Sequence, residues 1–274
     1  MMTPARLGLL ALALAACAWC LPLDLVLPVR AELPEKSARV VTYEIDARLD
    51  PGTNQVHAEG TLTWRNDSPV EVPDVYLHLY LNAFRDKFTT FMRESGGRHR
   101  GQPFRKDRAG GIELLAFQPE GGDDLVGQLE YVQPAEELPL VSKDTTVARI
   151  PLPEPIAPGA TATFKVKWVS TMPQVFARTG YGGDFYMVAQ WYPKPGVWEP
   201  VGGKARDDET ATWAWNCHHF HNTSEFYSDY GVYTVRIQVP ESYAGRVGAS
   251  GKRRPLSGRD DGGRRFPLAP TRPA

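Results

Sequence analysis

The chain has 274 residues, of which 42% are hydrophobic and 11% aromatic, with 31 basic against 32 acidic side chains. That length suffices for one large domain or two modest ones. The near-neutral balance argues against nucleic acid as a partner, since nucleic-acid-binding domains carry a clear excess of Lys and Arg. The charge is uneven, however: residues 1–31 carry +1, residues 252–274 carry +5, and the stretch 32–251 therefore carries −7. Three regions of different chemistry are predicted.

The first region, residues 1–31, is predicted to be an export signal. Arg6 supplies a positive start, and the apolar run over 7–16 is too short for a membrane-spanning helix of about 20 residues. Two processing sites stay open. The Leu-Ala-Ala-Cys run ending at Cys17 resembles the lipobox of bacterial lipoproteins and would give a lipid anchor, whereas residues 29–31 (VRA) fit an ordinary signal-peptidase site. Either site places the mature protein outside the cytoplasm, in a bacterial periplasm or cell envelope, or secreted.

The positions of the three cysteines predict that the mature protein has no internal disulfide. Cys17 and Cys20 lie in the predicted signal, so Cys217 is alone. The fold must therefore be stabilised by its hydrophobic core.

The second region, residues 32–251, is predicted to be a β domain that begins with a hairpin. Apolar and polar side chains alternate strictly over 41–50 and again over 56–65, which is typical of half-buried strands. The intervening residues 50–54 (DPGTN) have the composition of a turn. These features predict an antiparallel hairpin.

Further strands are expected along the rest of the domain. Over residues 75–81 aliphatic side chains on one face alternate with Tyr and His side chains on the other. Both faces of this strand should therefore be covered by other parts of the domain. The proline-rich stretch 151–159 predicts a loop, followed by strands over 161–168 and 233–239. Residues 85–125 are polar and Gly-rich and predict a long surface excursion. No sustained helical period occurs outside the signal, so the fold class is all-β: a large antiparallel sheet, saddle-shaped or sandwich-like.

Aromatic residues are concentrated near the end of this domain. Thirteen of the 29 Phe, Trp and Tyr residues fall within 181–233. Packing between sheets is one explanation, since wide sheets bury flat side chains well. A platform of exposed rings for carbohydrate is another, and the sequence leaves both open.

Several segments in this domain resemble one known family. They are residues 43–50 (YEIDARLD), 78–84 (HLYLNAF), 185–198 (FYMVAQWYPKPGVW), 215–218 (WNCH) and 222–233 (NTSEFYSDYGVY). In this order they resemble the N-terminal, non-catalytic β domain of a bacterial branch of the zinc aminopeptidases, the family that includes aminopeptidase N. The resemblance covers about residues 41–251.

The resemblance implies a role for this domain in binding peptides. In the family the N-terminal domain is a saddle of strands that closes one side of the substrate cleft, and a Gln from it is aimed at the bound peptide's N-terminal end. Gln190 stands at the matching position. Its amide can accept a hydrogen bond from an ammonium group and donate one to a carbonyl. A Gln satisfied by backbone groups is the alternative.

The chemistry of the family's active site is missing from this sequence. Zinc binding there needs H-E-x-x-H on a helix, with two His four residues apart. No two of the six His have that spacing, and the family's Gly-x-Met-Glu-Asn motif is also absent. The resemblance therefore implies a chain inactive alone, with no catalytic residue, and zinc in a catalytic domain that this chain lacks.

Three residues near the end of the domain have side chains that can bind a metal. Cys217, His219 and His221 would point to one side of an extended strand, and these residue types bind zinc. A structural zinc site needs four ligands, and the usual C-x-x-C or H-x-x-x-H pairs do not occur. Packing within the aromatic segment is the preferred interpretation, and no metal ligand is predicted.

The third region, residues 252–274, is basic and proline-rich. It has too few large apolar residues to offset its ordering entropy, which predicts disorder. Because the resemblance stops near residue 251, a frameshift or truncation is preferred to a genuine basic tail. The sequence as a whole predicts the non-catalytic N-terminal domain of an exported zinc metallo-aminopeptidase. The alternative is a stand-alone extracytoplasmic module that binds carbohydrate or peptide.

Overall fold

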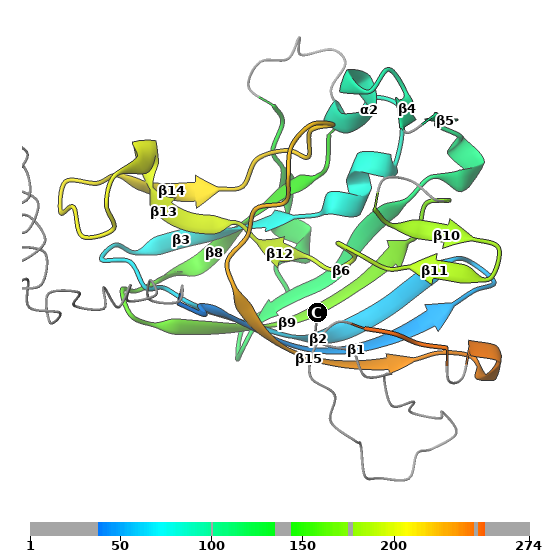
Figure 1. Cartoon of the computed structure of the whole chain (residues 1–274). Helices are drawn as coiled ribbons and strands as arrows, with labels where there is room; N and C mark the ends of the chain where they lie inside the picture. Colours follow the sequence, from blue (N-terminus) through cyan, green and yellow to red (C-terminus); the bar gives the residue numbers. More distant parts are fainter. Residues whose placement is uncertain (1–37, 100, 135–143, 175–177, 244–245, 250–274) are drawn as a thin grey trace, which may run out of the picture. The chain divides into compact units, whose positions relative to one another are not determined.

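The computed structural model describes residues 38–99, 101–134, 144–174, 178–243 and 246–249 (Figure 1). The predicted signal at 1–31, with Cys17, and the predicted tail at 252–274 lie outside these residues, and both stay predictions. Among the described residues, no helix has the length and apolar character needed to cross a membrane.

Two sheets make up most of the described structure. The larger has the strand order β15 (Gly231–Gln238), β1 (Val41–Asp50), β2 (Gln55–Arg65), β9 (Thr161–Thr171) and β6 (Gly111–Pro119). The smaller has the order β12 (Lys194–Pro195), β3 (Val72–His78), β8 (Val147–Ile156) and β7 (Glu130–Tyr131). All pairings within them are antiparallel except that of β1 with β15. The predicted fold class is confirmed.

Shorter elements complete the described chain. Three two-stranded ladders pair β4 (Arg98–His99) with β5 (Gln102–Pro103), β10 (Gly180–Gly182) with β11 (Phe185–Met187), and β13 (Val197–Pro200) with β14 (Trp213–Asn216). The α-helix α2 spans Thr90–Glu94. Short 3-10 helices are η2 (Tyr80–Phe84), η3 (Lys106–Arg108), η4 (Val126–Gln128), η5 (Val201–Gly203) and η6 (Glu241–Tyr243).

The predicted hairpin at the start of the domain is confirmed. β1 and β2 pair along their whole length, and buried and exposed side chains alternate strictly along β1. Gly60 lies opposite Ile45, where a Cβ atom would come within 1.9 Å of the carbonyl oxygen of Glu44. The close approach of the two strands therefore requires glycine at this position.

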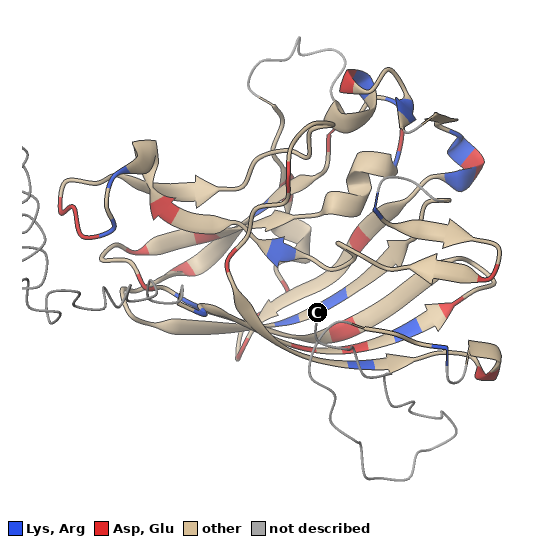
Figure 2. Ribbon diagram, in the orientation of Figure 1, with Lys and Arg blue, Asp and Glu red and all other residues tan. Residues whose placement is uncertain are grey.

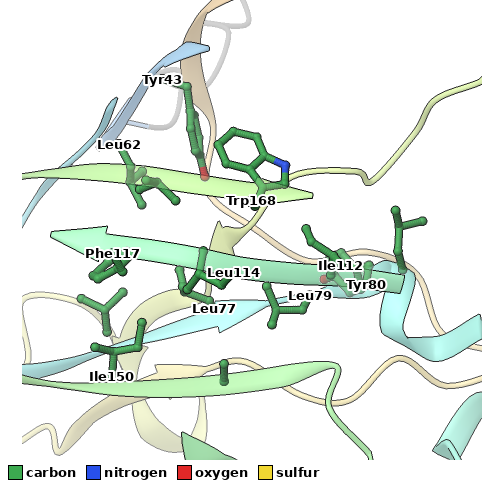
Figure 3. Close-up of a cluster of buried hydrophobic side chains, with 14 of the residues drawn as sticks. Tyr43, Leu62, Leu77, Leu79, Tyr80, Ile112, Leu114, Phe117, Ile150 and Trp168 are labelled. Atoms are coloured by element: carbon green, nitrogen blue, oxygen red, sulfur yellow. The ribbon is translucent and has the colours of Figure 1, made fainter. Parts of the chain in front are cut away.

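The two sheets share one hydrophobic core. Figure 3 shows side chains of β6 lying between those of β2 and β9 on one side and those of β3 and β8 on the other. Among the largest fully buried residues are Phe117, Phe164, Leu62, Leu77 and Ile150. The rings of Phe117 and Phe164 stack with centres 4.5 Å apart. Charged residues instead follow the exposed positions of the larger sheet (Figure 2).

Two predictions for the middle of the chain are wrong in part. The expected loop at 151–159 begins later, because β8 continues to Ile156. Its prolines are tolerated because β7 pairs with β8 only as far as Arg149, and no other described strand pairs with the rest of that edge. The expected strand at 75–81 ends at His78, and η2 follows. Both faces there are covered, as predicted, with His78 and Tyr80 almost fully buried.

The predicted surface excursion at 85–125 is also shorter than expected. Residues 111–119 form β6, a strand of the larger sheet with Ile112, Leu114 and Phe117 buried. A β-bulge between Leu114 and Ala116 shifts the register, so the buried positions do not follow one period of two. That irregularity hid the strand from the sequence pattern.

Candidate functional site

The segment that connects β11 to β12 carries Gln190, and hydrogen bonds fix the residues on either side of it. The backbone N–H of Ala189 donates to Thr179 Oγ1 at 3.3 Å, and the same hydroxyl donates to the carbonyl of Met187 at 3.2 Å. On the other side, the carbonyl of Trp191 accepts from Trp168 Nε1 at 3.1 Å and from the hydroxyl of Ser170. The position of Gln190 is therefore set by the sheets beneath it.

Gln190 has an unusual backbone conformation. Its φ angle is +54°, in the left-handed region that non-glycine residues rarely adopt, and such residues gather at binding and catalytic sites. The side chain is half-buried, and its Oε1 accepts a hydrogen bond from Nζ of Lys194. The Gln190 amide therefore has a lysine side chain as its partner. The alternative expectation, that backbone groups satisfy this amide, does not describe its oxygen.

Lys194 is the ionisable partner that sequence reasoning missed. It is only 8% exposed, and its backbone pairs with that of His78 across β12 and β3. Its Nζ lies 4.9 Å from the ring centre of Tyr192 and 5.7 Å from that of Tyr80, within reach of a cation–π interaction. Burial lowers the pKa of Lys194 to about 8. The sequence feature that could have drawn attention to Lys194 is its position between two prolines in an aromatic segment.

His78 lies behind this lysine and is neutral. It is fully buried, and its ring stacks on that of Tyr80 with centres 4.5 Å apart. Burial, His218 and Lys194 together lower the pKa of His78 to about 3. Its two ring nitrogens make no hydrogen bond within the described residues, although the nearby backbone of Tyr227 acts on the pKa in the opposite direction. The neutral ring leaves Lys194 as the charged group of this pair.

Apolar side chains next to Gln190 are exposed. Phe185, Met187 and Val188 have exposed fractions of 68%, 52% and 37%. We call these three residues, with Gln190, the Gln190 surface. Tyr186, between Phe185 and Met187, points the other way, and its hydroxyl donates to Asn54 Oδ1 at 2.5 Å. The hairpin of β10 and β11 is therefore anchored on one face and open on the other.

The aromatic segment mostly packs within the domain. Tyr233 stacks on Tyr43 with ring centres 4.9 Å apart, and Trp215 lies 5.2 Å from Trp64 by the same measure. The packing explanation therefore holds for these rings. A few rings do remain exposed, Tyr230 at 69% among them.

Cys217, His219 and His221 do not lie on one strand. β14 ends at Asn216, and the three side chains have different surroundings. His219 Nδ1 lies 3.2 Å from Asp144 Oδ1, and His221 Nδ1 lies 2.6 Å from Glu94 Oε1. Burial raises the pKa of the Cys217 thiol. No three His, Cys, Asp or Glu side chains among the described residues are placed to hold a metal ion.

A buried network ties helix α2 to the core. Asp144 is 0% exposed and accepts hydrogen bonds from the backbone N–H groups of Thr90 and Thr146, each at 2.8 Å. It also accepts a hydrogen bond from the hydroxyl of Thr146 at 2.5 Å. The ring of His219 contacts both Asp144 and Thr146. No local sequence pattern indicates this network, because Asp144 lies 54 residues from Thr90 and 75 residues from His219.

The chain was compared with protein-family models, curated proteins and solved structures, and only the comparison with solved structures gave matches. No protein-family model and no curated protein matches the chain. Among solved structures, one from Deinococcus radiodurans matches with 18% identity and a TM-score of 0.38. A point mutant of it bound to a Tyr-Ser-Ala substrate matches with 17% identity and a TM-score of 0.39. Those structures are M1 zinc metallopeptidases. Each match covers 86% of this chain and 40% of the solved chain, so this chain spans about two fifths of their length.

Proposed function

We propose that the described β domain is the non-catalytic N-terminal domain of an exported zinc metallo-aminopeptidase, with the Gln190 surface binding the N-terminal end of a peptide. The observation that carries the proposal is Gln190 itself, which has a left-handed backbone and an amide bonded to a buried lysine. Such a strained and fixed polar residue beside exposed apolar side chains is typical of a ligand-binding loop.

The proposal places zinc and the catalytic residues in polypeptide outside this chain. The sequence has no H-E-x-x-H, and the described residues hold no metal-binding trio. Export rests on the signal-like residues 1–31, with a lipid anchor at Cys17 as one route and free release to the periplasm or medium as the other. Fractionation of expressing cells tests it, and a cytoplasmic product would contradict export.

Peptide binding should depend on Gln190. We expect Gln190→Ala to weaken the binding of trialanine to the purified chain about tenfold, the equivalent of one lost hydrogen bond. Tryptophan fluorescence can report the binding, because Trp191 is next to Gln190. Gln238→Ala is the matched control, since Gln238 is exposed at the end of β15. Equal affinities for Gln190→Ala and wild type would contradict the proposal.

The purified chain should not hydrolyse aminoacyl bonds. After incubation with zinc, we expect no release of p-nitroaniline from alanine p-nitroanilide and no stoichiometric zinc by atomic absorption, because the sequence lacks H-E-x-x-H and no group of side chains among the described residues is placed to hold a metal ion. Turnover that rises with bound zinc would show a self-sufficient enzyme.

A second candidate function is a stand-alone module for carbohydrate or peptide. The exposed rings of Phe185 and Tyr230, at 68% and 69%, favour it, since such rings can stack on sugar faces. Binding on a glycan array that is lost in both Phe185→Ala and Tyr230→Ala would support this function over the first.

A further inference from the structure

The hydrogen bond between Gln190 and Lys194 fixes which end of the Gln190 amide faces the lysine. An ammonium group has three donors and no acceptor, so the amide atom that it contacts must be the oxygen. Gln190 Oε1 is that atom. Among the described residues the amide nitrogen has no hydrogen-bond partner, so its two N–H donors can meet a ligand.

Lys194 is itself held firmly. Backbone pairing to β3 fixes its main chain, and the ring centres of Tyr80 and Tyr192 lie 5.7 and 4.9 Å from its ammonium nitrogen. Since the lysine is 8% exposed, its charge has little contact with water. A buried charge of this kind is costly, and the hydrogen bond to the side-chain carbonyl of Gln190 offsets part of that cost.

We infer that Lys194 is a positioning residue that holds Gln190 by its oxygen, so that the Gln190 surface recognises a hydrogen-bond acceptor, a peptide carbonyl oxygen, through the Gln190 amide nitrogen. This inference rests on the proposed function that the surface binds peptides. It differs from the role implied by the family resemblance, in which the amide also accepts from the peptide's ammonium group. A second cation at Oε1 would lie close to that of Lys194 and would be repelled.

The ammonium group of Lys194 titrates close to neutral pH, because burial lowers its pKa to about 8. The groups that face it are His78 from β3, Tyr80 from η2, and Tyr192 and Gln190 from its own segment. Burial raises the pKa values of both tyrosines, and the pKa of His78 lies at about 3. His218 lies beyond His78, with ring centres 6.1 Å apart. Lys194, with a pKa of about 8, should therefore control Gln190 between pH 7 and pH 9.

Nuclear magnetic resonance of the Gln190 side-chain amide tests the positioning role without a ligand. The Gln190→Glu variant assigns the signal by removing it. In wild type we expect the signal to move with a midpoint near pH 8, and we expect no such transition in Lys194→Met. The amide of Gln118, which donates to the carbonyl of Gly122 at 2.8 Å, is the internal control. A Gln190 signal that does not change near pH 8 and is the same in Lys194→Met would overturn the inference.

Peptide binding to the Gln190→Glu variant tests whether the site recognises a carbonyl oxygen or the ammonium group of the peptide. A glutamate keeps the size of the side chain and its contact with Lys194, but it has only acceptors. We expect about tenfold weaker binding of both trialanine and N-acetyl-trialanine amide, the equivalent of one lost hydrogen bond. Tighter binding of trialanine by Gln190→Glu would show that the site recognises the ammonium and would overturn the inference. If wild type binds neither peptide, the proposed function fails, and the pH titration still decides the positioning role.

Discussion

Replacing Asp144 with alanine is expected to lower the free energy of unfolding by about 3–5 kcal/mol, because buried hydrogen-bond donors would lose a charged acceptor. Its carboxylate accepts hydrogen bonds from Thr90 and Thr146 and lies 3.2 Å from His219. The variant would leave these donors buried without their acceptor. Urea denaturation followed by tryptophan fluorescence measures the loss.

The pH dependence of this effect identifies its cause. Burial alone would raise the pKa of Asp144, but hydrogen bonds from His219, Thr146 and Thr90 outweigh it and lower the pKa. Because the folded-state pKa lies below the unfolded one, the stabilisation is present above about pH 4 and is lost as the pH falls further. We therefore expect the difference between wild type and Asp144→Ala to shrink below pH 4, and a difference that stays constant would contradict the ionic role.

Glu94→Gln is the matched control for this prediction. Glu94 lies at the other end of helix α2 and bonds His221 at 2.6 Å and the N–H of Asn222 at 2.8 Å. Its side chain is 39% exposed, so its contact with His221 is worth no more than about 1 kcal/mol. A loss as large as that of Asp144→Ala would show that the helix contact, and not the buried charge, provides the stability.

Lys194→Met is expected to stabilise the folded domain at pH 7, by about 1–3 kcal/mol. Keeping a lysine charged at a site where its pKa falls from 10.5 to about 8 costs up to about 3 kcal/mol. The lost hydrogen bond to Gln190 and the lost contacts with Tyr80 and Tyr192 offset part of that gain. A lysine kept at a cost in stability is expected of a functional residue.

The gain should depend on pH in a definite direction. Between about pH 8 and pH 10.5 the unfolded chain binds the lysine proton more tightly than the folded chain, so wild-type stability rises relative to that of Lys194→Met. The difference should therefore close as the pH rises through this range. Tyrosines that do not contact Lys194 affect both proteins equally and cancel in the comparison. A variant that is less stable than wild type at pH 7 would contradict a net cost for the buried charge.

The sequence predicts the regular strands of this domain well. Strict alternation in β1, β2 and β9 reflects one buried face, and it predicted the antiparallel hairpin of β1 and β2. It failed where local irregularity breaks the period of two: at the bulge in β6 and along the prolines of β8. The parallel pairing of β15 with β1 joins residues about 190 apart, which no local pattern can indicate.

The candidate site could be predicted only in part. Gln190 was found through a resemblance of its segment to a family, whereas Lys194 was missed because burial of a lysine between two prolines depends on tertiary contacts. The alternation of Cys217, His219 and His221 suggested one side of a strand, but β14 ends at Asn216, before all three. Contacts with Asp144 and Glu94 from distant segments decide where those two His lie.

Mapping the contact of trialanine by amide chemical-shift changes tests the central claim most directly. We predict that the changes gather on residues 180–194, around Gln190 and the exposed side chains of β11. Changes confined to another place, such as the cavity of about 170 Å³ lined by Phe84, Met92 and Arg108, would contradict a peptide-binding role for the Gln190 surface. So would the absence of any change at saturating peptide.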